Sequence, residues 1–258
     1  MLDLTTGALI AFSAFLMEVV DASLGMGYGT VLTPILLMAG FDVTHVVPAV
    51  IISQLGGDFA AAGFHHKLKN VRFTHGGSSE DLRIALTLGV MSAAGAIMAV
   101  LTAVRISKFY LNLYIGLLIT AIGFIVLALT IRKKPFSFSW LRLLGLGLFA
   151  SFNKGLSGGG YGPIVVSGQI VTGVDVKNAV GITSLAEGIV CLTAFLTYLM
   201  TTGVPDWPLA IYLSIGVLFS APVAALIVRK VEAEHLRLVI GVVTIILGVG
   251  TTMRLISP

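Results

Sequence analysis

Long apolar runs separated by short polar loops dominate this sequence. A helix that crosses a lipid bilayer needs about 20 largely apolar residues, and such runs recur along the whole chain. We predict ten helical segments, of which the second and the seventh have only about half the spanning length. They cover about residues 4–20, 30–39, 46–64, 84–104, 110–131, 141–152, 163–172, 176–200, 209–228 and 238–252. The predicted fold class is an all-α polytopic membrane protein.

The composition excludes several other classes of protein. Of the 258 residues, 57% are hydrophobic and 11% are charged, whereas about a quarter of the residues in a soluble domain are charged. An ordinary soluble enzyme and a disordered chain are therefore excluded. The single cysteine, Cys191, excludes a disulfide framework and a cysteine-based metal site. The net charge is +4, but the basic residues form short clusters between apolar runs, which indicates membrane orientation and not nucleic-acid binding.

The chain contains an internal duplication with an offset of 133 residues. Eight identities occur in the 23 positions 25–47, against roughly two expected from shared apolar bias. They pair Gly25, Gly27, Tyr28, Gly29, Gly40, Asp42, Val43 and Val47 with Gly158, Gly160, Tyr161, Gly162, Gly173, Asp175, Val176 and Val180. We therefore predict a first repeat at residues 1–132 and a second at 133–258, with five segments each. Because five is odd, the two repeats would lie inverted in the membrane.

The basic loops predict the orientation. If every segment crosses, loops 65–83, 132–142 and 229–237 lie on one side, and loop 201–208, which has no basic residue, lies on the other. If the two short segments were re-entrant, loop 229–237 would move to the opposite side. The positive-inside rule therefore favours ten crossings of a plasma membrane with both termini outside, although Arg105 and Lys108 then lie on the outer side.

Two glycine-rich breaks interrupt the apolar sequence, LGMGYGT at residues 24–30 and SGGGYGP at 157–163. Each precedes a short helix, and unpaired backbone at membrane depth survives only inside protein or against a watery cavity. The helix N-terminus directs its positive dipole end at the break, which suits a bound anion. Paired broken helices in two repeats indicate the central site of a transporter. The alternative is close helix packing through small residues.

Ionisable residues at membrane depth are rare and usually functional. Lys154, which follows Asn153, stands four residues before Gly158, and its counterpart in the first repeat is Asp21. Lys154 could neutralise a bound anion while Asp21 exchanges protons, or the two could form a buried ion pair that holds the repeats together.

Carboxyl groups in the apolar runs are candidates for proton coupling. Glu187 aligns with Gln54 of the first repeat, and a carboxyl group among apolar neighbours favours its neutral form, which suits a proton relay. Alternatively, Glu187 is a protonated side chain bonded to a helix neighbour. Glu18, near a helix end, and Asp58, one turn beyond Gln54, are weaker candidates. No metal site is expected, because His45 has no second ligand nearby in the sequence.

These residues resemble those of the TauE/SafE sulfite exporter family, also called the toluene-sulfonate uptake permeases. The resemblance rests on Glu18-x-x-Asp21-x-x-x-Gly25-Met-Gly-Tyr-Gly29, on the glycine-rich stretch 157–162 and on the stretch 179–185. It covers essentially the whole chain and implies a permease for small sulfur-containing anions such as sulfite, sulfoacetate and other organosulfonates. The chain departs from the usual Gly-Thr-Ser of the second repeat, with Gly-Ile-Thr-Ser at 181–184 and Ala-Val-Ile-Ile-Ser at 49–53.

We expect a secondary transporter of small sulfur-containing anions that is coupled to protons and works by alternating access. The alternatives are an uncoupled anion channel of the same fold and a carrier of another small carboxylate or oxyanion. The predicted substrate-binding residues are Gly27, Tyr28, Gly29, Ser53, Gln54, Asn153, Lys154, Gly160, Tyr161, Gly162, Thr183 and Ser184. The predicted proton-coupling residues are Glu187, Asp21 and Glu18. The expected partners are the anion, protons and the lipid bilayer, with a homodimer left open. We expect no enzyme, cofactor or nucleic-acid partner, since no convincing nucleophile–base pair is present.

Overall fold

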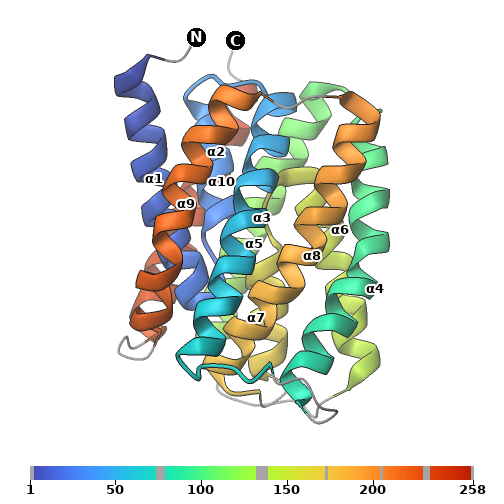
Figure 1. Ribbon diagram of the computed structural model, residues 1–258. Helices are drawn as coiled ribbons and strands as arrows, with labels where there is room; N and C mark the ends of the chain where they lie inside the picture. The colour runs from blue at the N-terminus through green and yellow to red at the C-terminus, as the bar shows by residue number, and fades with distance from the viewer. Residues whose placement is uncertain are drawn as a thin grey trace.

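The computed structural model describes residues 3–73, 79–131, 139–171, 174–203, 206–228 and 233–256, which form ten α-helices and no strand (Figure 1). The helices are α1 (Leu4–Leu24), α2 (Tyr28–Met38), α3 (Val43–Lys67), α4 (Glu80–Ala103), α5 (Lys108–Ile131), α6 (Trp140–Ser157), α7 (Tyr161–Val171), α8 (Val176–Thr202), α9 (Trp207–Ile227) and α10 (Ala233–Ile256). They follow the order of the ten predicted segments, with α2 and α7 as the short ones. The predicted boundary between repeats, residues 132 and 133, lies outside the described residues.

Polar residues and glycines set the ends of these helices. Asp42 caps the N-terminus of α3 by accepting from the Thr44 amide, and Asp175 caps α8 by accepting from the Lys177 amide. Side-chain oxygens at this position satisfy amides that have no partner within the helix. At the other end, Gly25 follows α1 with a φ of 70° and Gly158 follows α6 with a φ of 74°. Glycine adopts such positive φ angles without strain.

Several helices continue beyond the predicted apolar runs, and in α1 and α6 the added turns lie inside the bundle. The sequence predicts ends at Val20 and Phe152, whereas α1 continues to Leu24 and α6 to Ser157. The added turns carry Asp21 and Lys154, which are buried inside the protein and not exposed to lipid. A hydropathy pattern stops at a charged residue, but a helix continues wherever that charge finds a partner inside the bundle.

The described helices are those of a multi-pass membrane protein. Six of them, α1, α3, α4, α8, α9 and residues 108–128 of α5, are long and apolar enough to cross a membrane. Large apolar side chains such as Leu9, Phe124 and Phe219 are exposed on the outside of the bundle. Exposure of such an apolar surface to water is unfavourable, so these side chains indicate a surface that contacts lipid.

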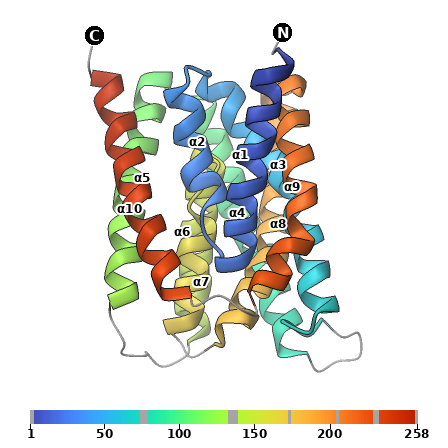
Figure 2. The same ribbon diagram turned by 90° about the vertical axis from the view of Figure 1, so that its left-hand side faces the viewer.

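Side-chain contacts identify which helix ends meet. At one end, Lys108 of α5 pairs with Asp42 at 2.5 Å, His45 lies 3.7 Å from Asp206, and Arg254 donates to the Leu37 carbonyl. Both chain termini lie at this end, which we call the terminal end (Figures 1 and 2).

The opposite end, which we call the loop end, joins other helix ends. There Asn178 of α8 donates to Asp81 of α4, and Arg83 lies over the Trp140 ring at the start of α6. Successive helices therefore alternate in direction, and the short helices α2 and α7 begin inside the bundle and not at one of its ends. The predicted basic residues at 132–134 and 229–230 lie outside the described residues.

The packing places α3 and α8 at the centre of the bundle. These two helices contact each other, α3 also contacts α9, and α8 also contacts α4. Around them, α1 packs on α9 and α6 packs on α4, while α5 and α10 pack on each other at one side (Figure 2). The short helices α2 and α7 lie between this outer pair and the centre (Figure 2).

Candidate functional site

The two glycine-rich breaks meet inside the bundle. A methyl group on Gly29 would lie 1.8 Å from the Gly158 carbonyl oxygen, and one on Gly162 would lie 2.4 Å from the Gly25 carbonyl oxygen. Only glycine permits backbones to approach this closely. Gly29 and Gly162, in the first turns of α2 and α7, therefore lie at one junction with Gly158 and Gly25. Methyl groups on Gly27 and Gly160 would instead meet Val20 and Ile122.

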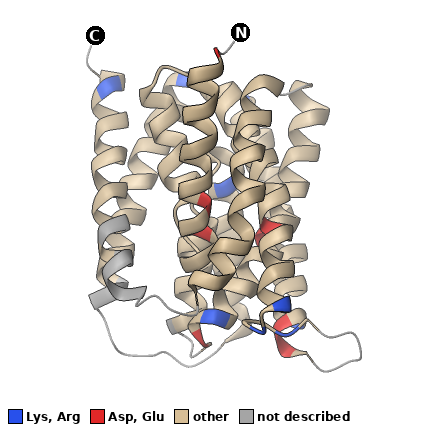
Figure 3. Cartoon of the chain, turned by 60° about the vertical axis from the view of Figure 1, so that its left-hand side comes forward, with Lys and Arg blue, Asp and Glu red and all other residues tan. Residues whose placement is uncertain are grey.

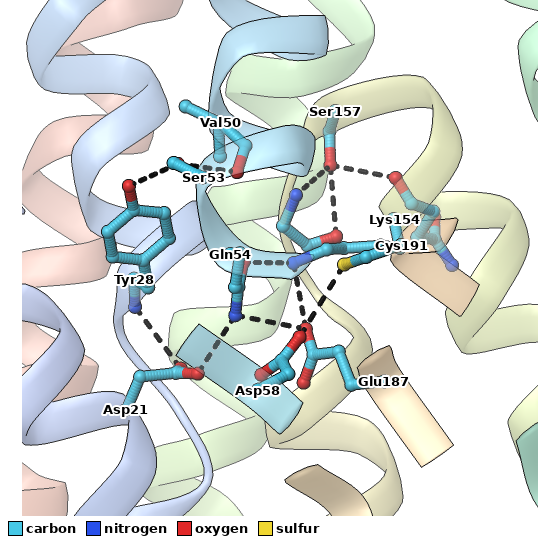
Figure 4. A network of polar contacts seen from close by, with 12 residues as sticks. Asp21, Tyr28, Val50, Ser53, Gln54, Asp58, Lys154, Ser157, Glu187 and Cys191 are labelled. Carbon is cyan, nitrogen blue, oxygen red and sulfur yellow. Dashed lines mark hydrogen bonds and ion pairs between the residues drawn. The ribbon is translucent and has the colours of Figure 1, made fainter. Parts of the chain in front are cut away.

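Charged residues lie at mid-height of the bundle as well as at its ends (Figure 3). Lys154 is fully buried, and its Nζ lies 2.8 Å from Oε1 of Glu187. The same ammonium donates to Oε1 of Gln54, whose amide nitrogen lies 3.3 Å from Glu187 (Figure 4). A buried ammonium needs such partners because desolvation of an isolated charge is costly.

Asp21 joins this network through Gln54 and not through direct pairing with Lys154. Its Oδ2 accepts from Nε2 of Gln54 at 3.0 Å, and its Oδ1 accepts from the Tyr28 amide at 3.2 Å (Figure 4). The carboxylate of Asp21 thus occupies the N-terminus of α2, where the helix dipole favours negative charge. Lys154 instead pairs with Glu187, a contact that the sequence did not predict.

Both tyrosines of the breaks are fully buried. The Tyr28 hydroxyl lies 2.6 Å from the Ser53 hydroxyl, which lies 2.9 Å from the Val50 carbonyl oxygen (Figure 4). The Tyr161 hydroxyl lies 3.4 Å from the Ser92 hydroxyl of α4. Sequence reasoning missed Ser92, because α4 carries no motif that links it to the second break.

Three other predicted residues have hydrogen bonds outside the Lys154 network. Asn153 accepts from Tyr114 and donates to a carbonyl of its own helix. Thr183 accepts from Gln169 at 2.7 Å, and Ser184 donates to the Val180 carbonyl. These contacts attach the second break and α8 to their neighbours.

A group of carboxyl groups lies beside the network. Glu18 of α1 and Asp58 of α3 are buried with Asp21, and one oxygen of each lies within 4.8 Å of the others. Asp58 also contacts the thiol of Cys191 at 3.5 Å. Asp58 was only a weak candidate from the sequence, and the signal for it was its spacing of four residues from Gln54, which places both on one face of α3.

Comparison with known proteins identifies the family. The model of the family described as Sulfite exporter TauE/SafE matches residues 10–251. The chain belongs to the TauE/SafE family. It is also similar to the "Probable membrane transporter protein YtnM" of Bacillus subtilis (strain 168), with 24% identity over 254 residues that cover 95% of this chain and 82% of that protein. No solved structure matches the chain.

Membership of the TauE/SafE family agrees with the fold. This chain is a membrane transporter with several spanning helices, and its family and its relative are both described as transporters and not as enzymes. Its buried polar network joins α1, α3, α6 and α8 through Asp21, Gln54, Lys154 and Glu187.

Proposed function

We propose that this TauE/SafE protein is a secondary carrier of small sulfur-containing anions, such as sulfite or organosulfonates, in the plasma membrane. The observation that carries the proposal is the fully buried Lys154, which is held by Glu187 of α8 and Gln54 of α3. A buried ammonium is a counter-ion for an anion that has lost its water. The description of the family as sulfite exporters supports a sulfur oxyanion as the substrate.

The anion binds at the second break in this proposal. Asp21 already supplies a carboxylate to the N-terminus of α2, whereas the equivalent position before α7 is Lys154, which cannot accept a hydrogen bond. Amides of Gly160–Gly162 at the α7 N-terminus, together with Lys154, would therefore hold the oxyanion. In this proposal the second repeat would contribute Tyr161, Thr183, Ser184 and Asn153 to the site, and the first repeat would contribute Gly27–Gly29, Ser53 and Gln54.

Proton coupling follows from competition for Lys154. In the structure the Glu187 carboxylate forms an ion pair with the Lys154 ammonium at 2.8 Å. An incoming anion replaces Glu187, and a carboxylate left buried without a counter-charge takes up a proton because the charged form is costly there. One proton then accompanies each bound anion. Asp21 and Glu18 were the other predicted proton acceptors, and Glu187 is favoured because it alone pairs with Lys154 among the described acidic residues.

Two inverted repeats would provide alternating access. The helix pairs that pack together match under exchange of the repeats: α1 on α9 corresponds to α6 on α4, and α3 on α9 corresponds to α8 on α4. The capping residue Asp42 lies at the terminal end and its counterpart Asp175 begins α8 at the loop end. Rocking of one repeat against the other would open the buried site to each side in turn.

Flux into proteoliposomes tests the proposal. We expect saturable transport of at least one of sulfite, sulfoacetate, thiosulfate and sulfate, with a rate that rises when a pH gradient is imposed. Linear, non-saturating flux would instead identify a channel, and transport of carboxylates alone would replace the substrate class. Absence of flux of all four anions by folded protein would contradict the substrate assignment.

Variants of the ion pair test the mechanism. Lys154→Gln should abolish flux, because the dehydrated anion loses its counter-charge. Since this change also leaves Glu187 unpaired, the double variant Lys154→Gln with Glu187→Gln serves as the control that restores folding without restoring transport. Glu187→Gln alone should keep saturable flux but lose its dependence on the pH gradient. Full transport by Lys154→Gln would remove the lysine from the site.

A further inference from the structure

Three buried carboxyl groups converge beside the Lys154 network. Glu18 and Asp21 lie three residues apart on α1, and Asp58 faces them from α3. All three are buried, and one oxygen of each lies within 4.8 Å of the other two. Like charges this close repel strongly when water is excluded, so the cluster needs a positive partner if it is ionised.

The environment of Glu18 indicates that such a positive partner binds here. Its side chain is 0% exposed, and neither of its carboxyl oxygens has a hydrogen-bond partner in the part of the chain that the structure describes. Gly57 of α3 makes room for it, since a methyl group there would lie 2.8 Å from Oε1 of Glu18. A buried polar side chain without a partner is costly and indicates a ligand at that place.

The described residues supply the cluster with few hydrogen-bond donors and with no ammonium that lacks another partner. Lys154 is the only buried lysine or arginine among the described residues, and it already forms an ion pair with Glu187 at 2.8 Å. Asp21 accepts from the Tyr28 amide and from Gln54. Within the described part of the chain, the hydrogen bond to Asp58 is the weak one from the thiol of Cys191 at 3.5 Å. The negative charge of the group is therefore not balanced by side chains in the described residues.

The geometry suits a small, hard metal cation. Oxygen ligands lie about 2.3–2.6 Å from Ca²⁺, so two oxygens on opposite sides of one ion are separated by at most about 5 Å. Carboxylates are the ligands that such hard cations prefer over soft metals. One oxygen of each group lies within 4.8 Å of the others, which allows one ion to contact all three groups.

The duplication provides an independent argument. The positions equivalent to Glu18, Asp21 and Asp58 in the second half of the chain are Ser151, Lys154 and Cys191. The acidic cluster thus exists in one half only, and a lysine stands at the equivalent of its central member. The two halves of one centre are equipped for ions of opposite sign.

We propose that Glu18, Asp21 and Asp58 form a binding site for a hard metal cation, either Na⁺ or a divalent ion such as Ca²⁺ or Mg²⁺. Gln54 connects this site to Lys154. Its Nε2 donates to Asp21 at 3.0 Å, and its Oε1 accepts from the Lys154 ammonium. The cation therefore stabilises the arrangement that presents Lys154 to an anion. This last step, in which the cation favours anion binding, rests on the proposed carrier function.

Cation binding can be measured without any transported anion. The purified full-length protein, stripped of metal ions, is melted in NaCl, MgCl₂, CaCl₂ or MnCl₂ and in choline chloride at equal ionic strength. We expect the melting temperature to rise with the concentration of at least one metal ion and not with choline. Elemental analysis after dialysis should find that ion bound to the protein. Equal melting in all salts with no bound ion would overturn the site and leave protons as the occupants.

Matched variants locate the site. Glu18→Gln and Asp58→Asn should each lose the metal-dependent rise, whereas Asp206→Asn, at the surface of the terminal end, should retain it. In metal-free buffer Glu18→Gln should melt above the wild type, because it removes an unpartnered buried charge. A metal-dependent rise that persists in both cluster variants would place the ion elsewhere and refute the proposal. If Glu18→Gln does not fold, Asp58→Asn and elemental analysis still decide the question.

The two proposals can fail separately. The double variant Lys154→Gln with Glu187→Gln leaves the three carboxyl groups intact, so it should bind the metal ion while it has lost anion flux. Metal binding by a protein that carries none of the four anions would contradict only the carrier. Saturable anion flux in metal-free choline medium, at the rate seen with metal ions, would contradict only the role of the cation.

Discussion

At the scale of single residues, equivalent positions of the duplicated sequence have acquired different chemistry and then contact each other. Gln54 and Glu187 are equivalent and lie 3.3 Å apart, and Asp58 and Cys191 are equivalent and lie 3.5 Å apart. Such pairs meet because α3 and α8 pack against each other at the centre. A duplicated backbone therefore builds one asymmetric network out of related positions.

The close approach of the two breaks predicts a strong effect of one methyl group. Gly29→Ala should lower stability by about 1–3 kcal/mol or more, as expected for overpacking, because the new atom meets backbone that has no alternative rotamer. Gly63→Ala is the control, since nothing lies within 4 Å of its added methyl group. Thermal melting in detergent measures both. A Gly29→Ala protein that melts with the control would show that the breaks separate easily.

At the scale of elements, the start of α3 depends on an ion pair as well as on a cap. Asp42 accepts from Thr44 and pairs with Lys108 of α5 at 2.5 Å. Partial burial raises the pKa of Asp42, but the hydrogen bonds from Lys108 and Thr44 outweigh it and lower the pKa to about 2. Because the folded pKa is below the unfolded one, this stabilisation is complete above about pH 5 and is lost as the pH falls from about 4 to 2.

The variant Asp42→Asn tests this linkage, because asparagine keeps the cap and removes the charge. We expect it to melt below the wild type at neutral pH and to approach the wild type as the pH falls toward 2. Asp175→Asn is the matched control, since Asp175 caps α8 in the same way with no ion pair to a described residue. A difference between Asp42→Asn and wild type that is independent of pH would assign the effect to packing.

At the scale of the whole molecule, the arrangement of the ends predicts the orientation in the membrane. The loop end carries Lys67, Lys69, Arg72, Arg83, Arg142 and Lys177, whereas Arg105, Lys108 and Arg254 lie at the terminal end. Because cytoplasmic loops carry the excess of basic residues, we expect the loop end to face the cytoplasm and both termini to lie outside.

Thiol labelling of intact cells measures this orientation. In a Cys191→Ala background, Ser107→Cys at the terminal end should react with a membrane-impermeant reagent, and Glu80→Cys at the loop end should react only after permeabilisation. Both native residues are exposed at their helix ends, and the native Cys191 is buried. Labelling in the reverse order would invert the assignment.

The sequence by itself determined the helical membrane class, the ten segments, the two glycine-rich breaks and most residues of the central network. These follow from local properties, because apolar run length and glycine content are sufficient to predict spans and breaks. Only the tertiary structure decided that Lys154 pairs with Glu187, that Asp21 caps α2, and that Asp58 joins Glu18 in one carboxyl cluster. Helix packing determines which buried charges lie close enough to pair, and neither hydropathy nor the repeat spacing predicts those distances.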